Sequence, residues 1–187
     1  MGSDPTDHVV LLDDAGLPAG TTPRSTVHTS ATPLHLGFSC YLLDADGQVL
    51  LTRRALSKRT WPGVWTNSFC GHPRQDESLL QAVRRHGRHE LGLEVTATDL
   101  VLPRFRYRAV DADGVVENEI CPVLFASAQG DPEPHPDEVM DHRWVDPSEL
   151  ADLVDVAPWV LSPWMVDQVR QLAGAGRPPT SWAGAGR

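Results

Sequence analysis

The segment from residue 77 to residue 91 constrains the fold more than any other part of the chain. Its apolar residues Leu79, Leu80 and Val83 recur near the spacing of one helix face, and Gly92 follows the last position. Glycine tolerates the left-handed backbone that commonly ends a helix, so a cap is expected at Gly92. We therefore predict one helix over residues 77–91.

Two Asp-Ala-Asp-Gly segments, at residues 44–47 and 111–114, lie between apolar runs. Glycine tolerates the positive φ that tight turns require, which makes both segments hairpin signals. The strands are expected at residues 38–43, 48–52, 104–109, 117–126 and 140–145, and two further helices at residues 147–154 and 162–172. Strands in hairpins with helices packed on their faces predict an α+β fold with a mixed sheet.

The length of 187 residues suits one domain with a hydrophobic core of its own. We expect this domain to span residues 8–173. The polar residues 1–7 and the Gly- and Pro-rich residues 174–187 are predicted to be flexible ends. No run of 18 or more apolar residues occurs in the sequence, so no membrane span is expected.

The formal net charge of -9 argues against a nucleic-acid partner, because affinity for phosphate backbones needs a clustered excess of Lys and Arg. An anionic substrate would need locally placed cations, and among the 16 basic residues Lys58 is the one lysine. Cys40, Cys70 and Cys121 are odd in number and far apart, which indicates a reducing compartment rather than a disulfide framework. With no secretion signal at the start, we expect a cytoplasmic protein, either a monomer or a weak homodimer.

Six residues around the predicted helix have the spacing of a known loop-helix-loop motif. They are Gly71, Glu77, Arg85, Glu90, Gly92 and Leu93. This spacing resembles the Nudix box, which binds a metal-diphosphate. Two other positions that are acidic in that box hold His86 and His89, so Glu90 alone remains of the usual three carboxylates. The resemblance implies the Nudix scaffold without its full hydrolytic metal cluster.

Five longer segments resemble type 1 isopentenyl-diphosphate isomerases, a family within the Nudix superfamily. They are residues 53–58 (RRALSK), 61–73 (WPGVWTNSFCGHP), 105–109, 117–122 and 162–165, and the resemblance runs in the family's order from residue 8 to residue 169. It implies a Nudix-like mixed sheet flanked by helices. It also implies an activity, the interconversion of isopentenyl and dimethylallyl diphosphate in isoprenoid biosynthesis.

The sequence offers ligands for a metal ion. Glu117 and Glu119 lie two apart on a predicted strand, so both side chains point to the same face and can bind one ion. The resemblance adds His28, His35 and His72, and implies that the five side chains hold one divalent ion in an approximately octahedral site. Three imidazoles and five ligands favour manganese or another first-row ion, with zinc as a substitute.

The resemblance implies a second ion, magnesium, at the substrate diphosphate, held by Glu90 and the backbone carbonyl of Cys70. Magnesium usually keeps few protein ligands and several water or phosphate oxygens, so one glutamate suffices. The cations expected to bind the diphosphate are Arg54, Lys58 and Arg24. Arg85 has two interpretations, an ion pair that holds the loop or a contact with substrate.

An isolated double bond moves when one carbon receives a proton and a carbon two bonds away loses one, through a tertiary carbocation. Water would capture that cation, so the site must be dry and carry an acid/base group on each side. The resemblance implies Cys70 on one side and Glu119 with Tyr107 on the other, and places the ring of Trp164 against the cation. It stays open which of Cys70 and Glu119 protonates in each direction.

Two other functions fit parts of the sequence. A Nudix pyrophosphohydrolase acting on a nucleoside or other diphosphate accounts for the box, but leaves the histidines, the Glu117/Glu119 pair and Cys70 without roles. A non-catalytic diphosphate-binding module predicts loss of the acid/base groups, and Cys70, Tyr107 and Glu119 are all present. Incubation with isopentenyl diphosphate separates the enzymes, because one forms dimethylallyl diphosphate and the other releases phosphate.

Overall fold

The computed structural model describes residues 7–182, which form twelve strands, four α-helices and two short 3-10 helices. The strands are β1 (His8–Leu12), β2 (Pro18–Pro23), β3 (His35–Leu36), β4 (Phe38–Leu42), β5 (Val49–Arg54), β6 (Trp65–Thr66), β7 (Phe69–Gly71), β8 (Glu94–Leu102), β9 (Arg106–Val110), β10 (Val116–Ile120), β11 (Val123–Gln129) and β12 (Val139–Val145). The helices are α1 (Arg24–Val27), α2 (Leu79–Leu91), α3 (Pro147–Val156), η1 (Pro158–Val160), α4 (Pro163–Gly174) and η2 (Pro179–Ser181).

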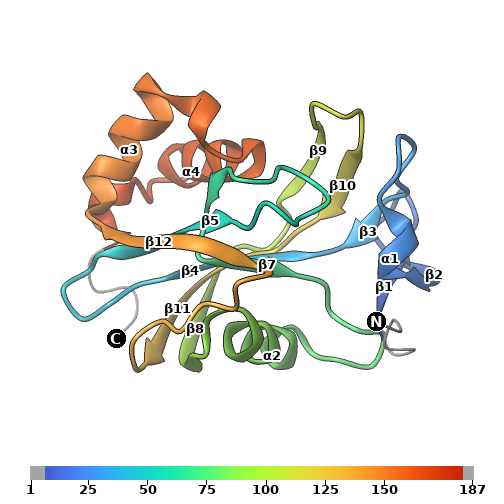
Figure 1. Ribbon diagram of the computed structural model, residues 1–187, viewed down its shortest axis with the longest axis horizontal. Coiled ribbons are helices and arrows are strands. Elements are labelled where there is room, and N and C mark those ends of the chain that lie inside the picture. The colour runs from blue at the N-terminus through green and yellow to red at the C-terminus, as the bar shows by residue number, and fades with distance from the viewer. Residues whose placement is uncertain (1–6, 183–187) are drawn as a thin grey trace.

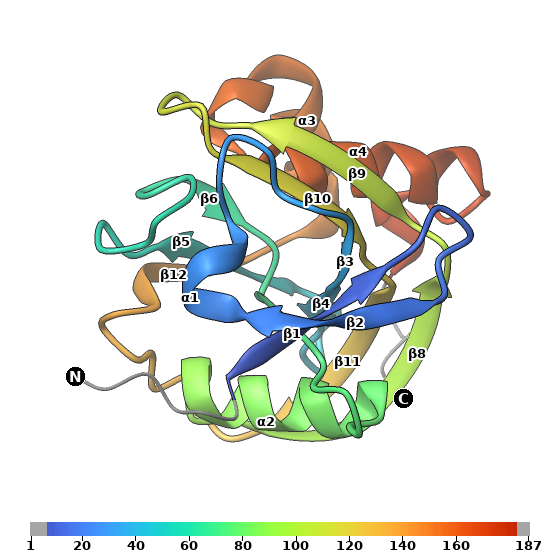
Figure 2. The same ribbon diagram turned by 90° about the vertical axis from the view of Figure 1, so that its right-hand side faces the viewer.

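The strands form three sheets with the orders β2-β1-β3-β10-β9, β7-β4-β11-β8 and β12-β5-β6. Helices cover the strands from two sides: α2 lies along one side, and α3 and α4 lie along the other (Figures 1 and 2). Buried apolar side chains fill both layers, including Val83 and Leu91 of α2 on one side and Leu150 of α3 and Met165 of α4 on the other. Parallel pairs occur beside antiparallel ones, so the predicted α+β fold with a mixed sheet flanked by helices is confirmed.

The helix predicted over residues 77–91 is confirmed as α2, which begins two residues later. Ser78 is its N-cap: the Ser78 hydroxyl accepts a hydrogen bond from Gln81 N, and the Gln81 side chain bonds back to Ser78 N. This capping box satisfies backbone donors that the first turn leaves unpaired. Gly92 ends the helix in the left-handed conformation, with φ of 68°. Local sequence therefore sets both ends of this helix.

The turn predicted at residues 44–47 forms, but the hairpin around it does not. Asp44 Oδ1 accepts hydrogen bonds from Asp46 N and Gln48 N, which closes the turn. The strands on either side share one bridge, Leu43 with Val49, and then part. β4 continues between β7 and β11, whereas β5 continues between β12 and β6. The prediction of a hairpin was wrong because partners distant in sequence take over the hydrogen bonds of both strands.

The strand predicted over residues 117–126 is two strands in different sheets. β10 pairs antiparallel with β9 across the turn at residues 111–114, which confirms the second hairpin. The chain then passes through Cys121 and Pro122 before β11 joins the other sheet. Proline has no backbone N–H to give to a ladder, so the pairing is interrupted there.

Six strands were not predicted from the sequence: β1, β2, β3, β6, β7 and β8. β8 is antiparallel to β11, and its content of β-branched residues (Val95, Thr96, Thr98 and Val101) is a signal that could have revealed it. β3 pairs with β1 on one side and is parallel to β10 on the other, with His35 opposite Glu119. This short strand therefore brings together two residues of the candidate site that are far apart in the sequence.

The C-terminal residues 174–182, which belong to the expected flexible end, are partly packed against the core. The indole of Trp182 is fully buried, with ring contacts at 5.4 Å to Tyr41 and 4.7 Å to Phe125. Its Nε1 donates a hydrogen bond to Arg177 O. Residues 1–6 and 183–187, the remainder of the two expected flexible ends, lie outside the described residues. Within residues 7–182, no helix has the length and apolar character needed to cross a membrane.

Candidate functional site

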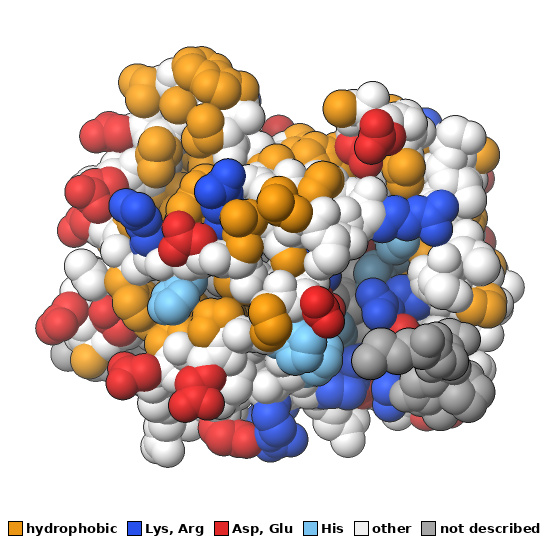
Figure 3. All heavy atoms as spheres, in the orientation of Figure 1, with side chains coloured by type: hydrophobic (Ala, Val, Ile, Leu, Met, Phe, Trp, Pro, Cys, Tyr) orange, Lys and Arg blue, Asp and Glu red, His pale blue; other side chains and the backbone are white. Residues whose placement is uncertain are grey.

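A cavity of about 510 Å³ is lined by the N-terminal segment around α1, the segment after β5, β7 with the loop after it, α2 and the β9–β10 hairpin. Six of the 16 Lys and Arg residues of the chain line it, although the net charge of the protein is -9. In Figure 3, blue basic side chains gather with pale blue histidines around the hollow on the right half of the face. The basic residues are Arg24, Arg54, Lys58, Arg59, Arg74 and Arg85. The cavity therefore has the local positive charge that an anionic ligand requires.

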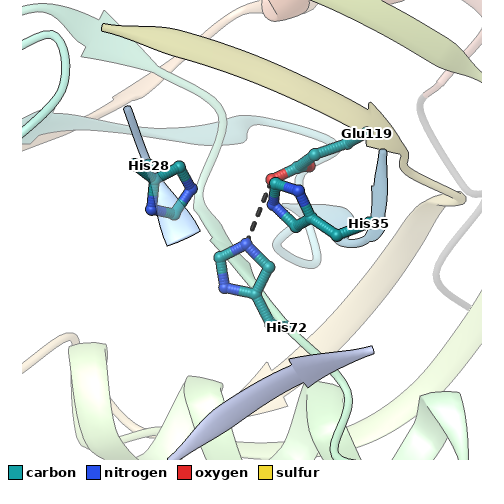
Figure 4. Close-up of side chains that lie close together, drawn as sticks. All are labelled: His28, His35, His72 and Glu119. Atoms are coloured by element: carbon teal, nitrogen blue, oxygen red, sulfur yellow. Dashed lines mark hydrogen bonds and ion pairs between the residues drawn. The ribbon is translucent and has the colours of Figure 1, made fainter. Parts of the chain in front are cut away.

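Three histidines and Glu119 meet at one side of this cavity. Their ligand atoms all lie within 4.8 Å of one another. Figure 4 shows the four side chains turned toward a common point. They come from separate elements: His28 follows α1, His35 lies in β3, His72 follows β7, and Glu119 lies in β10. The cluster predicted from the sequence thus assembles only through the tertiary fold.

The side chains in the cluster lie close together, but hydrogen bonds among them satisfy only some of their polar atoms. His28 Nε2 lies 3.0 Å from Glu117 Oε2, so Glu117 adjoins the cluster as its fifth member. Glu119 Oε1 lies 3.1 Å from His72 Nε2 and 3.4 Å from His35 Nε2. Among the described residues, three buried side-chain atoms lack a hydrogen-bond partner, and all three belong here: His28 Nε2, His35 Nε2 and Glu117 Oε2.

Unpaired buried polar atoms cost about 1–3 kcal/mol each, so a cluster of them needs a compensating partner. Imidazole nitrogens and carboxylate oxygens with lone pairs converging on one point are the donor set that a first-row divalent cation prefers. The five residues therefore fit a divalent metal ion.

Neighbouring groups orient two of these ligands. His35 Nδ1 lies 2.9 Å from Pro33 O, and a carbonyl can only accept, so His35 carries its proton on Nδ1 and has a lone pair on Nε2. The Thr60 hydroxyl donates to Glu117 Oε1 at 2.8 Å, which leaves Oε2 facing the cluster. Thr60 was not identified from the sequence, because nothing local marks a threonine 57 positions away as a partner.

Charge states in the cluster also suit metal binding. Burial alone would raise the pKa of Glu119, but the neighbouring imidazoles of His35 and His72 hold that pKa well below its usual value. Burial lowers the pKa of His72, which favours the neutral imidazole that binds metals. At neutral pH the cluster therefore offers an ionised carboxylate and an unprotonated ring.

Gly37 is a site residue that the sequence analysis missed. A Cβ atom at Gly37 would lie 2.2 Å from Glu119 Oε2 and 2.7 Å from Glu119 Cδ, much closer than real Cβ contacts allow. The Glu119 carboxylate therefore occupies the space that any other residue at position 37 would fill. The only local signal was a glycine directly before an apolar strand, which by itself has many explanations.

Cys70 lies in β7, and its sulfur lines the cavity. The thiol donates to Asn67 Oδ1 at 3.2 Å, and Ser39 Oγ lies 3.4 Å away on a neighbouring strand. Burial raises the pKa of Cys70 to about 11, so the sulfur carries its proton at neutral pH. Cys40 and Cys121 are buried and do not line this cavity, as expected for small apolar residues.

Tyr107 and Trp164 form an aromatic wall of the cavity. Tyr107 lies opposite Glu119 in the β9–β10 pair, on the same face of the sheet. Both residues lie in the described part of the chain, where the Tyr107 hydroxyl makes no hydrogen bond to Glu119. The centroid of the Tyr107 ring lies 5.7 Å from that of the Trp164 ring. The guanidinium of Arg54 lies 5.5 Å from the Trp164 ring centroid, which shows that this ring accepts a cation nearby.

Glu90 lies in the last turn of α2 and lines the same cavity as Cys70. Glu90 Oε1 lies 2.8 Å from His86 Nδ1. Burial alone would raise the pKa of Glu90, but the bond to His86 and the charges of Lys58 and Arg54 lower it. The carboxylate is therefore ionised where the helix dipole disfavours negative charge, a cost that a bound cation offsets.

The three cations expected at the diphosphate all line the cavity, and each already has a partner. Arg24 Nε lies 2.8 Å from Asp7 Oδ2, Arg54 Nη2 donates to Thr60 O at 2.8 Å, and the Lys58 ammonium pairs with the Glu138 carboxylate. Glu138 was not identified from the sequence, because it lies 80 positions beyond Lys58. These basic side chains are thus held at the cavity by acids and carbonyls before any anion binds.

Arg85 holds the loop that carries His72. Arg85 Nε and Nη2 donate to the two carboxylate oxygens of Glu77 at 2.8 and 2.7 Å, and Nη2 also donates to His72 O at 3.0 Å. Of the two interpretations of Arg85, the ion pair is confirmed. The bidentate geometry requires arginine rather than lysine.

Comparisons with known proteins agree with this geometry. The NUDIX domain family matches residues 33–165. An isopentenyl-diphosphate Delta-isomerase of Agromyces mediolanus is 59% identical over 164 residues, which cover 88% of this chain and 80% of that protein. One of Clavibacter sepedonicus is 57% identical over 164 residues, covering 88% of this chain and 86% of that protein. A crystal structure from Deinococcus radiodurans is similar in fold alone, with a TM-score of 0.67 at 18% identity, covering 88% of this chain and 98% of that one.

Proposed function

This chain belongs to the NUDIX domain family and, within it, to the family of isopentenyl-diphosphate Delta-isomerases, and we propose on that premise that it interconverts isopentenyl and dimethylallyl diphosphate. The observation that carries the proposal is that Cys70, Glu119 and the aromatic wall line one cavity, and that the five-residue metal cluster lies at one side of it. A pyrophosphohydrolase has no use for a thiol and an indole at this place.

The reaction needs one group that holds a proton and one that can accept a proton at the same cavity. At neutral pH the Cys70 thiol is protonated and Glu119 is ionised, so the pair meets this requirement. Tyr107 lies across the sheet from Glu119 and is the nearest aromatic hydroxyl to position that carboxylate. Burial holds the pKa of Tyr107 well above its usual value, so the hydroxyl keeps its proton at neutral pH.

The developing carbocation needs an electron-rich surface and protection from water. Trp164 is 3% exposed and is packed edge to face against Trp61 at 5.4 Å, which keeps its ring rigid at the cavity. A cation over a desolvated indole gains about 2 kcal/mol or more. The rings of Trp164 and Tyr107 therefore provide the aromatic wall beside which the cation would form.

Two divalent ions complete the proposed site. His28, His35, His72, Glu117 and Glu119 would hold a manganese ion or, in its place, zinc, because three imidazoles are unusual ligands for magnesium. Such an ion would supply positive charge that lowers the pKa of Glu119. Glu90 and the Cys70 carbonyl would hold magnesium together with the substrate diphosphate. The three free cysteines suit the reducing interior of the cytoplasm, where we place the enzyme as a monomer or weak homodimer.

Incubation of the metal-loaded protein with isopentenyl diphosphate tests the proposed function. We expect dimethylallyl diphosphate to accumulate until the two isomers reach equilibrium, with no release of phosphate or pyrophosphate. Proton NMR distinguishes the isomers by their vinyl and methyl signals, and a colorimetric assay detects phosphate. Release of phosphate without isomerisation would instead identify a hydrolase.

Lys58→Ala is expected to raise the Michaelis constant for isopentenyl diphosphate and to lower kcat/KM by about tenfold to a hundredfold. The ammonium pairs with Glu138 in the free protein, and we expect the diphosphate to replace that carboxylate as its partner. A charge-assisted hydrogen bond contributes about 1.5–3 kcal/mol, which sets this scale. Steady-state kinetics, with elemental analysis to verify the metal content, measure the effect.

Two variants control for side effects of Lys58→Ala. Arg88→Ala removes the same charge from an exposed ion pair with Glu94, and should leave KM unchanged. The double variant Lys58→Ala/Glu138→Gln removes the cation without leaving Glu138 uncompensated, so it isolates the loss of the phosphate contact. A change of KM within twofold in both Lys58 variants would mean that metal and arginine hold the diphosphate without Lys58.

A further inference from the structure

Asn67 is fully buried between β6 and β7. Its amide nitrogen donates to Cys40 O at 3.1 Å and to Phe69 O at 2.8 Å. Both partners are backbone carbonyls, which can only accept, so the orientation of the amide group is determined. The amide oxygen therefore faces the opposite way, toward Cys70 and Trp164, which line the cavity.

That one oxygen joins two side chains to which the proposed reaction assigns different tasks. The Cys70 thiol donates to Asn67 Oδ1 at 3.2 Å, and the Trp164 indole N–H donates to the same oxygen at 3.1 Å. Cys70 and Trp164 lie 94 positions apart, on a strand and on a helix from different parts of the chain. The Thr66 hydroxyl also donates to this oxygen, at 2.9 Å, from outside the cavity lining.

A second buried chain of hydrogen bonds reaches the sulfur from another side. Gln168 Nε2 donates to Ser39 Oγ at 2.9 Å, and Gln168 Oε1 accepts from the Tyr41 hydroxyl at 2.8 Å. Ser39 Oγ in turn lies 3.4 Å from Cys70 Sγ. Gln168, Ser39 and Tyr41 are completely buried. Because the Cys70 proton is directed at Asn67, this chain supports the sulfur without competing for that proton.

We propose that Asn67 is a positioning residue, which holds the proton-transferring sulfur of Cys70 and the cation-facing ring of Trp164 in a fixed relative geometry through one shared acceptor atom. The proposal rests on the proposed isomerase function. Proton transfer to or from carbon requires the sulfur and the cation to meet at a defined distance. The two groups lie on separate elements. A buried side chain that hydrogen-bonds to both of them, and whose other polar atoms are also bonded, keeps the distance between them fixed.

Asn67→Ala is expected to lower kcat by tenfold or more while KM changes by less than about threefold, since a misplacement of about 1 Å at a reacting group costs up to about a hundredfold in rate. KM should be preserved because the cations and Glu90 that bind the diphosphate make no contact with Asn67. Thr66→Val is the matched control: it removes another donor to the same oxygen, together with the contact of Thr66 with Ser162 Oγ, but leaves the bonds of Cys70 and Trp164 to Asn67. We expect the control to keep kcat within threefold.

Infrared spectroscopy provides a readout that a merely structural role would not move. The S–H stretching band of Cys70, isolated as the difference between the wild-type protein and Cys70→Ala, should lie at the lower frequency of a hydrogen-bonded thiol. The band should move to higher frequency in Asn67→Ala and stay in place in Thr66→Val. A wild-type Cys70 band at the frequency of a free thiol would overturn the proposal, even if Asn67→Ala failed to fold.

The outcomes separate this inference from the proposed function. If Cys70→Ala turned over normally, the proposed role of the thiol would fail. A second outcome is that Cys70→Ala is inactive, while Asn67→Ala folds, loads metal and keeps both its kcat and its S–H band. In that case only the positioning role of Asn67 would be wrong. A lower kcat of Asn67→Ala together with a shifted S–H band would support both the role of the Cys70 thiol and the positioning role of Asn67.

Discussion

Cys70→Ala should reduce isomerisation by about a hundredfold to ten-thousandfold, the contribution of a well-placed acid/base group. The sulfur lines the cavity and carries a proton at neutral pH, since burial raises the pKa of Cys70 to about 11. Alanine removes that proton and leaves only a small space. The initial rate of dimethylallyl diphosphate formation, measured with metal-loaded protein, gives the effect.

The chain supplies its own control for this experiment. Cys40 is a fully buried cysteine on the neighbouring strand, and Cys40→Ala removes the same atoms without touching the cavity. We expect that variant to keep its turnover rate at the cost of some stability, measured as a lower Tm. Ordinary turnover by Cys70→Ala at full metal content would remove the thiol from the mechanism.

Gly37→Ala is expected to abolish high-affinity metal binding and, with it, isomerase activity. The added Cβ would lie 2.2 Å from Glu119 Oε2, so the carboxylate must leave its place beside His35 and His72. The end of a side chain moves more easily than backbone, so the fold should survive while the ligand is displaced. Loss of even an outer partner of a metal ligand costs about tenfold to a hundredfold in affinity, so displacing a ligand itself should cost at least that.

Elemental analysis after equilibration with limiting manganese measures this prediction. The wild-type protein should hold one manganese ion per chain at the cluster. Gly37→Ala should hold clearly less than one ion per chain. Gly174→Ala is the control, because a Cβ there has no neighbour within 4 Å and the backbone is helical. Equal metal content in wild type and Gly37→Ala would show that Glu119 is not a ligand.

The sequence by itself determined what depends on neighbouring residues. The ends of α2 follow from a capping box at Ser78 and a left-handed Gly92, and the turn at residues 44–47 follows from the side chain of Asp44. The ligand types were also apparent, because Glu117 and Glu119 share one face of a strand whatever that strand pairs with. Similarity to the isomerase motifs supplied the histidines, which no local rule connects to these glutamates.

Only the tertiary structure decided which distant groups meet. β4 and β5 leave their shared turn for different sheets, and the unforeseen strand β3 sets His35 opposite Glu119. The shared oxygen of Asn67 likewise depends on α4, which brings Trp164 to the segment between β6 and β7. Strand pairing and buried hydrogen bonds join residues tens of positions apart, and their free energy depends on the whole packed arrangement. Local propensity carries no information about these partners, because each pairing becomes favourable only after the rest of the chain has excluded water from it.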